Sequence, residues 1–558
     1  MGRIKIPVGC SSFPDIRQNG YYFIDKSGLI KELLKTEGTQ VTLITRPRRF
    51  GKTLVMSMLS AFFDIRRDSR EWFEGLSVTE DQELCEKWRN QYPVVTLSFK
   101  SVDGLNFSNA YAQMAAVISR AYQEHLYLMD SEAVNPYEKE VFDRLASKKG
   151  TQEEVENSLL SLTKMLAAHY GRQVILLIDE YDVPLAKASE KGYYTEMLAV
   201  VKGVMQVIKD NESLKFAVLT GCLRIAKESI FTGTNNFVSD TISDTRLNEY
   251  FGFTQIEVDR LLWDTGLASH EAEMKKWYDG YHFGDFDVYC PWDVMNHVRN
   301  LLLNPDSVPG NFWENTSDNA VIRAFLKRTD FDVNDKFETL LAGGYIKESM
   351  EENLTYDVLE GAEENLWSLL YFTGYLTRMR PEEITGQRLL PGQYALKIPN
   401  TEVLEIFKKS VKAWFVEMTA EKDRRELFAA LWDGNAEKLT SLISELLFGT
   451  ISYHDYAESF YHAFITGLFS NAGYRVESNY ENGLGRSDLV VKDRRNRRAV
   501  ILEAKRAGYE EELEKECEEG LMQIEEKQYA RKVQRDGYQQ VVRLGIAFFQ
   551  KKCLVKRG

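Results

Sequence analysis

Short runs of consecutive apolar residues alternate with amphipathic stretches over the first 245 residues of the chain. Continuous apolar runs are typical of strands that are buried on both faces of a parallel sheet. The expected strands lie at 41–45, 93–99, 174–179 and 215–221, and the expected helices near 54–64, 107–125, 151–169 and 193–209. This alternation predicts an α/β domain whose ligand lies beyond the carboxyl ends of the strands.

The rest of the chain is divided by changes in this pattern. Residues from about 250 to 304 are helical and aromatic, a loop with two prolines follows, and the stretch from 311 to about 450 is mainly helical. In the last hundred residues we expect a helix near 455–471, strands at 474–479, 487–492, 498–503 and 541–549, and an acidic helix near 509–534. The pattern predicts four parts, at 1–245, 246–310, 311–452 and 453–558.

The first expected strand runs through a turn into a helix that opens with Gly51, Lys52 and Thr53. In the pattern G-x-x-x-x-G-K-[ST], backbone N–H groups surround one phosphate, the lysine binds the β and γ phosphates, and the hydroxyl ligates Mg²⁺. Arg46 stands where this pattern has its first glycine, so the loop must bend without it. The residues expected to bind the nucleotide here are Arg48, Arg49, Phe50, Gly51, Lys52 and Thr53.

Polar residues end two later strands on the same predicted edge. Asp179 would hold Mg²⁺ together with Thr53, and Glu180 would orient or deprotonate the attacking water. Thr220 ends the next strand, and Arg224 either stabilises charge on the γ phosphate or is a surface or structural arginine. The arginines of the loop itself would contact phosphates or a partner chain, or form a solvated basic turn.

Composition narrows the function further. A chain of 558 residues with 44% apolar content can bury large cores, and its net charge of −14 argues against a protein that coats nucleic acid through its overall field. Six scattered cysteines indicate reduced thiols rather than a disulfide framework or a zinc module. No apolar run approaches the roughly 18 residues that span a bilayer, and the N-terminus lacks the apolar stretch of a signal peptide. We therefore expect a cytoplasmic protein with no membrane partner.

A second group of chemical residues lies near the C-terminus. Asp488 begins one strand of a predicted hairpin, and Glu503 and Lys505 project to one face of the other strand. Two carboxylates that hold Mg²⁺ or Mn²⁺, together with a lysine, are what hydrolysis of a phosphodiester requires, and the order is that of the PD-(D/E)XK fold. A surface salt bridge or an inactive nuclease fold is the alternative. The basic turn at 492–498 would touch DNA or RNA, or is a solvated hairpin tip.

Motifs along nearly the whole chain resemble those of the bacterial AAA-ATPase-like family. They are YFIDKS (22–27), RPRRFGKT (46–53), DEYD (179–182), TG (220–221), RIAKESIF (224–231), WYDGY (277–281) and LLYFTGYL (369–376). In this family the glycine missing at Arg46 is commonly absent. The resemblance implies an ATP-binding P-loop fold and a C-terminal PD-(D/E)XK-like α/β domain. Together with the pattern described above, this gives an AAA-like parallel sheet domain, a helical lid at 246–310 and a helical connector at 311–452 as the expected architecture. The resemblance also implies that Glu458 is an accessory acidic metal ligand and that Gln523 is the helical glutamine of the nuclease-like site.

The predicted function is a P-loop ATPase whose nucleotide state controls a metal-dependent nuclease-like domain. One alternative is a nucleotide-dependent switch that captures a protein partner through an inactive nuclease-fold module. Another is a motor that translocates nucleic acid, although the sequence contains no sign of a channel. A homo-oligomer is compatible with all three.

Overall fold

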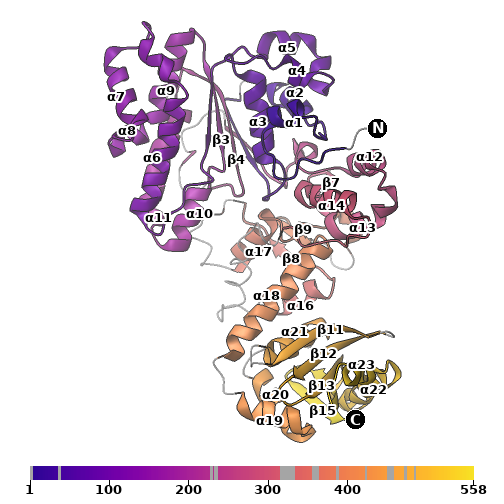
Figure 1. Cartoon of the computed structure of the whole chain (residues 1–558). Coiled ribbons are helices and arrows are strands. Elements are labelled where there is room, and N and C mark those ends of the chain that lie inside the picture. The colour runs from indigo at the N-terminus through magenta and orange to yellow at the C-terminus, as the bar shows by residue number, and fades with distance from the viewer. Residues whose placement is uncertain are drawn as a thin grey trace. The chain divides into compact units, whose positions relative to one another are not determined.

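The computed structural model of the chain divides into two compact units (Figure 1). The first comprises Met1–Ser317 and Lys347–Thr401, and the second comprises Asp318–Ile346 and Glu402–Gly558. The structure describes residues 4–35, 39–225, 230–231, 237–313, 334–352, 354, 363–384, 389–420, 424–448, 458–470, 474–482 and 485–558. Residues 347–401 pack with the first unit, whereas the domain boundaries expected from the sequence stay predictions.

The first unit is built on a five-stranded parallel sheet, which contains the four strands expected from the apolar runs and a fifth, β5, that was not expected. Its strands, in the spatial order β2-β3-β4-β1-β5, are β1 Val41–Thr45, β2 Val94–Ser98, β3 Val174–Asp179, β4 Leu214–Gly221 and β5 Phe237–Asp240. Ile44 pairs with Thr220, and Ser98 pairs with Asp179. The polar residues that end these strands therefore meet at one edge of the sheet.

Helices cover both faces of this sheet, and Figure 1 shows the two groups on either side of β3 and β4. Alternate residues of β3 enter different cores, since Ile175 and Leu177 face one group while Leu176 and Ile178 face the other. The first group is α1 Phe13–Gln18, α2 Gly28–Lys35, α3 Lys52–Phe63, α4 Arg70–Phe73 and α5 Gln82–Trp88. The second is α6 Phe107–Gln123, α7 Pro136–Ala146, α8 Gln152–Glu156, α9 Ser158–Tyr170, α10 Val183–Lys191 and α11 Tyr194–Val204.

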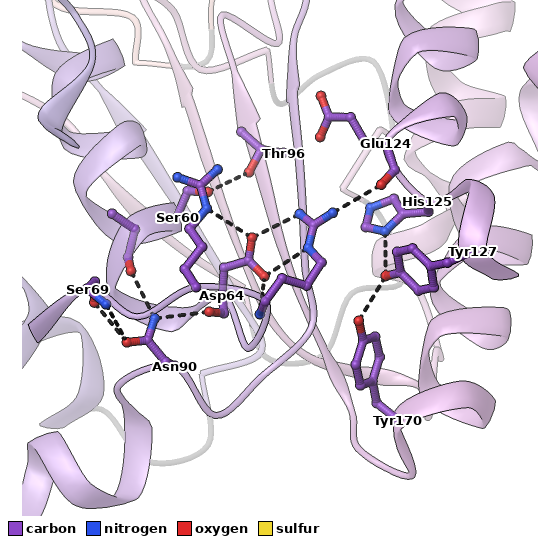
Figure 2. Close-up of polar contacts among 12 residues, drawn as sticks. Ser60, Asp64, Ser69, Asn90, Thr96, Glu124, His125, Tyr127 and Tyr170 are labelled. Carbon is purple, nitrogen blue, oxygen red and sulfur yellow. Dashed lines mark hydrogen bonds and ion pairs between the residues drawn. The ribbon is translucent and has the colours of Figure 1, made fainter. Parts of the chain in front are cut away.

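A buried polar network fastens the C-terminal end of α3 (Figure 2). Asp64 is fully buried and accepts hydrogen bonds from Arg66 and Arg67, and Arg66 also donates to the backbone carbonyl of Glu124. His125 Nδ1 lies 2.9 Å from the Tyr127 hydroxyl. Burial, together with the charge of Arg66, lowers the pKa of His125 from 6.5 to about 3. The helix α3 is thus held at its C-terminal end by a network of charged and neutral groups.

The residues after the sheet, where a helical lid was expected, have their own apolar core. They form α12 Gln255–Thr265, α13 Glu271–Tyr278, the hairpin β6 Tyr281–Phe283 and β7 Phe286–Val288, and α14 Pro291–Leu303. The segment that returns to this unit adds α17 Glu363–Phe372 and a small sheet of β8 Ile346–Ser349, β10 Gln393–Lys397 and β9 Thr377–Arg378. The mainly helical pattern at 311–450 did not anticipate these strands, because strands of two to five residues are too short to show a period.

The second unit contains a mixed five-stranded sheet in the order β11-β12-β13-β14-β15. α22 and α23 pack on one face, and Tyr461 of α21 stacks on Phe548 of β14. The elements are α16 Asn334–Leu341, α18 Thr401–Ala420, α19 Arg425–Asp433, α20 Ala436–Phe448, α21 Glu458–Phe469, β11 Arg475–Asn482, β12 Gly485–Asp493, β13 Arg498–Arg506, α22 Leu513–Glu526, α23 Tyr529–Arg535, β14 Gln540–Phe549 and β15 Lys552–Arg557.

The acidic helix expected at 509–534 is wrong as a single helix. The chain forms α22 and α23 there, separated at Gln528, which adopts a left-handed backbone with φ 54°. A residue in this conformation interrupts the helical backbone. The sequence has no glycine or proline at this position to indicate the break. Within the described residues, no helix is long and apolar enough to cross a membrane.

Candidate functional site

The turn between β1 and α3 forms a closed loop around the side chain of Lys52. Lys52 is buried, and its Nζ donates to the carbonyls of Arg46 at 2.9 Å and Pro47 at 3.1 Å. Gly51, with φ 86°, directly precedes α3, and Arg49 also has a positive φ of 74°. No acidic residue lies in the first turn of α3. The N-terminal end of this helix therefore presents backbone N–H groups and a positive dipole end suited to an anion.

Four predicted residues, from α3 and from the ends of β3 and β4, meet directly behind this loop. The Thr53 hydroxyl donates to Asp179 Oδ2 at 2.8 Å, and the Thr220 hydroxyl donates to Asp179 Oδ1 at 2.6 Å. Glu180 Oε1 lies 3.5 Å from Lys52 Nζ. Asp179 and Thr220 are buried and do not line the cavity described below, so Thr220 contributes by holding Asp179 in place.

The electrostatics of the site follow from burial among several carboxylates. Burial, reinforced by Glu180, raises the pKa of Asp179. Burial by itself would lower the pKa of Lys52, but Cys222 and the neighbouring carboxylates outweigh it and raise that pKa. Lys52 is consequently a permanent cation, which is the form that binds phosphate.

A cavity of about 470 Å³ opens beside the loop, a size typical of small-molecule sites. The predicted residues that line it are Arg48, Arg49, Phe50, Gly51, Lys52, Thr53 and Glu180. The apolar part of its lining includes Val8, Tyr22, Phe23, Phe253, Trp292 and Met295. An apolar and aromatic wall joined to a phosphate loop suits a ligand with a flat ring at one end and phosphates at the other.

The second predicted site lies on the sheet of the second unit. Glu503 of β13 is buried, and Gln523 Nε2 of α22 donates a hydrogen bond to its Oε1. Lys505 follows two residues later on the same strand. Leu489 of β12 pairs with Leu502 of β13, which places the backbone of Asp488 beside that of Glu503. The side chains of Asp488 and Glu458 lie outside the described residues, so their roles stay predictions.

Both domains match models of known families. Residues 7–231 match the model described as "Predicted AAA-ATPase", and residues 456–558 match the model described as "PD-(D/E)XK nuclease superfamily". The chain joins an AAA-ATPase-like domain to a PD-(D/E)XK superfamily domain. It is also 25% identical over 506 residues to a protein of Azotobacter chroococcum mcd 1 described as "Uncharacterized protein in vnfD 5'region", covering 88% of this chain and 87% of that protein. The similarity therefore extends over both domains.

The oxygen ligands in the ATPase-like domain fit Mg²⁺. Thr53 Oγ1 and Asp179 Oδ2 are 2.8 Å apart, close to the separation of about 3 Å between neighbouring ligands in an octahedron with bonds of roughly 2.1 Å. Glu180 Oε2 is buried and forms no hydrogen bond in the described structure. No cluster of three or more His, Cys, Asp or Glu side chains suited to a metal occurs among the described residues. Mg²⁺ at this place would therefore depend on phosphate oxygens as well as protein oxygens.

Arg46 is not part of a solvated turn, contrary to that alternative for the loop arginines. It is fully buried, donates to the carbonyl of Asp240 at 2.9 Å, and lies over the Phe251 ring at 5.0 Å. Its backbone N–H continues the sheet by donating to Gly221 O, and its φ is not positive. A glycine is consequently unnecessary at this position, because the left-handed residues of the loop are Arg49 and Gly51.

Aromatic residues to which the sequence assigned no contact pack against the loop. Phe50 is buried against the rings of Tyr281 and Phe283, and the Arg49 guanidinium lies 4.1 Å from the centre of the Trp292 ring. The WYDGY motif at 277–281 ends in one of these aromatic residues. Its aromatic content was a signal, but the pattern did not indicate what it contacts.

The third acidic residue of the DEYD motif, Asp182, was also missed. Asp182 Oδ2 accepts hydrogen bonds from the backbone N–H groups of Cys222 and Leu223 at 2.9 and 3.0 Å. The Tyr181 hydroxyl donates to Leu223 O at 2.7 Å and accepts from Ile225 N at 2.9 Å. These contacts fasten the segment after β4, which carries Arg224. Arg224 itself is not part of the cavity lining in the described structure.

Proposed function

We propose that the ATPase-like domain binds ATP with Mg²⁺ and hydrolyses it. The observation that carries this proposal is the meeting of Thr53, Asp179 and Thr220 behind a loop whose lysine lies 3.5 Å from Glu180. The adjoining cavity of about 470 Å³ supports it, since its aromatic wall suits the base and its loop suits the phosphates.

The side chains have separate tasks in this hydrolysis. Mg²⁺, when bound, neutralises charge on the β and γ phosphates. Lys52 contributes a second positive charge to the phosphates, and the N–H groups at the start of α3 orient them. Glu180 lines the cavity, and its Oε2 atom forms no hydrogen bond in the described structure. We therefore assign to this carboxylate the role of accepting a proton from the attacking water. Asp182 and Tyr181 keep the segment after β4 in position.

The C-terminal domain is proposed to hydrolyse phosphodiester bonds of nucleic acid with Mg²⁺ or Mn²⁺. Its family and the hydrogen bond between Gln523 and Glu503 support this assignment. Glu503 and Asp488 would hold the metal, with Glu458 as a further ligand, and Lys505 would stabilise negative charge that develops during attack. The nucleotide state of the first domain would control this activity.

Two assays on the purified full-length protein test the proposal. The first measures phosphate release from ATP, and the second measures cleavage of DNA and RNA with Mg²⁺ or Mn²⁺, with and without ATP. Glu180→Gln should lower ATP turnover by about 10²- to 10³-fold while ATP still binds, since it removes the proton acceptor. Glu503→Gln should abolish cleavage and leave ATP turnover unchanged.

Matched controls change an exposed glutamate in each domain, namely Glu196→Gln and Glu511→Gln. Both should behave as the wild type. ATP turnover that survives Glu180→Gln would refute the assigned base. Absence of metal-dependent cleavage, or equal cleavage by Glu503→Gln, would refute the nuclease assignment and leave a nucleotide-dependent switch as the better account.

A further inference from the structure

Exposed arginines gather on one end of the nuclease-superfamily domain. They come from two segments, the turn that joins β12 to β13 and the helix α23. We call this set the basic face, and its members are Arg494, Arg495, Arg497, Arg531 and Arg535. The turn alone was visible in the sequence, whereas the contribution of α23 appears only in the fold.

Three contacts place the two segments side by side. Gln539 N donates to Arg497 O at 2.8 Å, and Arg498 is paired with Gln540 across β13 and β14. Lys492 Nζ, at the base of the turn, lies 3.4 Å from Asp536 Oδ2, directly after α23. The C-terminal end of α23, which carries Arg535, therefore lies beside the base of the turn.

The carboxylates at this end of the sheet are already used to hold the turn together. Glu477 accepts a hydrogen bond from Lys492 at 2.7 Å, and Asp493 accepts from Arg498 at 3.0 Å and from the backbone of Arg495 at 3.1 Å. Within the described structure no member of the basic face forms an ion pair. Arg531 also donates to Gln528 Oε1 at 2.9 Å, which is a neutral acceptor. The guanidinium groups of the basic face are thus not neutralised by a carboxylate of the described structure, on a protein whose net charge is −14.

We propose that the basic face binds the phosphodiester backbone of a nucleic acid. Guanidinium groups match phosphate oxygens with two parallel hydrogen bonds, and they are less strongly hydrated than lysine ammonium groups. The acidic remainder of the molecule repels a polyanion, so binding concentrates where the positive charge is local. The proposal rests on the proposed nuclease function for the choice of nucleic acid as ligand.

The position of the basic face predicts how far its phosphate contacts lie from the bond that would be cleaved. Arg498 and Glu503 are five residues apart on β13, or about 17 Å at roughly 3.3 Å per residue. A duplex advances about 3.4 Å per nucleotide along its axis, so a duplex lying along β13 would place phosphates about five nucleotides from Glu503 beside Arg498, where the basic turn ends. It acts in positioning the substrate and takes no part in bond cleavage.

The test is a binding measurement without cleavage. Fluorescence anisotropy of labelled 20-base-pair DNA and RNA duplexes is recorded in EDTA at several salt concentrations, using full-length Glu503→Gln protein. The same background carrying R494E/R495E/R535E should bind both at least about tenfold more weakly, with a salt slope lower by roughly 0.9 for each phosphate that the protein no longer neutralises. R494K/R495K/R535K keeps the charge and should retain most of the affinity and the slope.

A variant with three reversed charges elsewhere, K149E/K164E/K276E, controls for the change in net charge and should bind like the parent protein. Circular dichroism and the melting temperature of each variant confirm that it is folded. The inference is overturned if the parent binds neither duplex, if the arginine-to-glutamate variant binds as tightly as the control, or if polyglutamate binds as tightly as the nucleic acids. Binding through this face with no cleavage by the wild type would instead refute only the nuclease activity.

Discussion

Replacing Gly374 by alanine tests whether the phosphate loop depends on a segment more than 300 residues away. Gly374 belongs to the LLYFTGYL motif, has φ 89°, and packs against Pro47 of the loop. A Cβ at this position would lie 2.9 Å from Pro47 Cβ and 3.2 Å from Pro47 Cγ. Proline is a rigid ring within the loop, so the loop backbone must move to relieve this contact.

Gly392→Ala is the matched control. Gly392 has φ 79°, but a Cβ there meets no atom within 4 Å. Both substitutions cost about 1–2 kcal/mol, because alanine is strained in the left-handed region. Gly374→Ala must in addition displace Pro47 and with it the N–H groups that are proposed to bind the phosphates. Hydrogen bonds to a charged group contribute about 1.5–3 kcal/mol each, so misalignment of one should raise the Kd for ATP by about ten- to hundredfold.

Isothermal titration with ATP and Mg²⁺, together with the melting temperature of each variant, separates the two effects. Both variants should melt at a lower temperature than the wild type, and Gly374→Ala alone should bind ATP more weakly. Equal ATP affinity in the two variants would show that packing by Gly374 does not hold the loop. An equal drop in affinity in both would mean that general destabilisation is sufficient to explain it.

Two further predictions concern other parts of the first unit. Trp292→Ala removes an aromatic side chain from the cavity wall and the ring that the Arg49 guanidinium contacts. It should weaken ATP binding at least about tenfold in titration calorimetry and change the affinity for tripolyphosphate much less. Equal weakening for both ligands would contradict a base-binding role for Trp292. His125 has a folded-state pKa of about 3 and an unfolded value of 6.5, so the unfolded chain binds the proton first and stability falls as the pH drops through this window. By pH 5 the free energy of unfolding should be lower by about 2 kcal/mol than at pH 7.5. His125→Asn should lack this decrease when urea unfolding is compared at the two pH values. An identical pH dependence in both proteins would show that His125 is not held neutral.

The parts of the fold and site that the sequence predicts are those with local signals. The apolar strands, the Gly51-Lys52-Thr53 turn and the polar strand ends all lie within a few residues of the feature they indicate. Parallel topology then brings Asp179 and Thr220 to one edge without any knowledge of side-chain packing. The same reasoning places Glu503 and Lys505 on one strand of the C-terminal sheet.

Long-range packing has no such signal. Tyr22 and Trp292 line one cavity, yet 270 residues separate them and neither lies in a periodic pattern that indicates a ligand. The split of the acidic helix at Gln528 depends on a single left-handed residue. The basic face depends on α23 lying beside the hairpin turn, which follows from the pairing of β13 with β14 and from contacts such as that between Lys492 and Asp536.

The WYDGY and LLYFTGYL motifs contain no residue with a proposed catalytic or binding role, and their packing against the loop gives a physical reason for them. Pro47 is packed by Gly374, and Phe50 is packed by Tyr281, so a change in the loop on binding ATP must be accommodated by both neighbours. Close-packed groups of this kind move together, because a shift of less than about 1 Å already produces a clash. The chain that carries Gly374 continues through β9 and β10 into α18, where the second unit begins. The segment that packs against the loop is thus covalently joined to the second unit at Thr401, one of three places where the chain passes between the units, and the proposed control by nucleotide state would need such a connection.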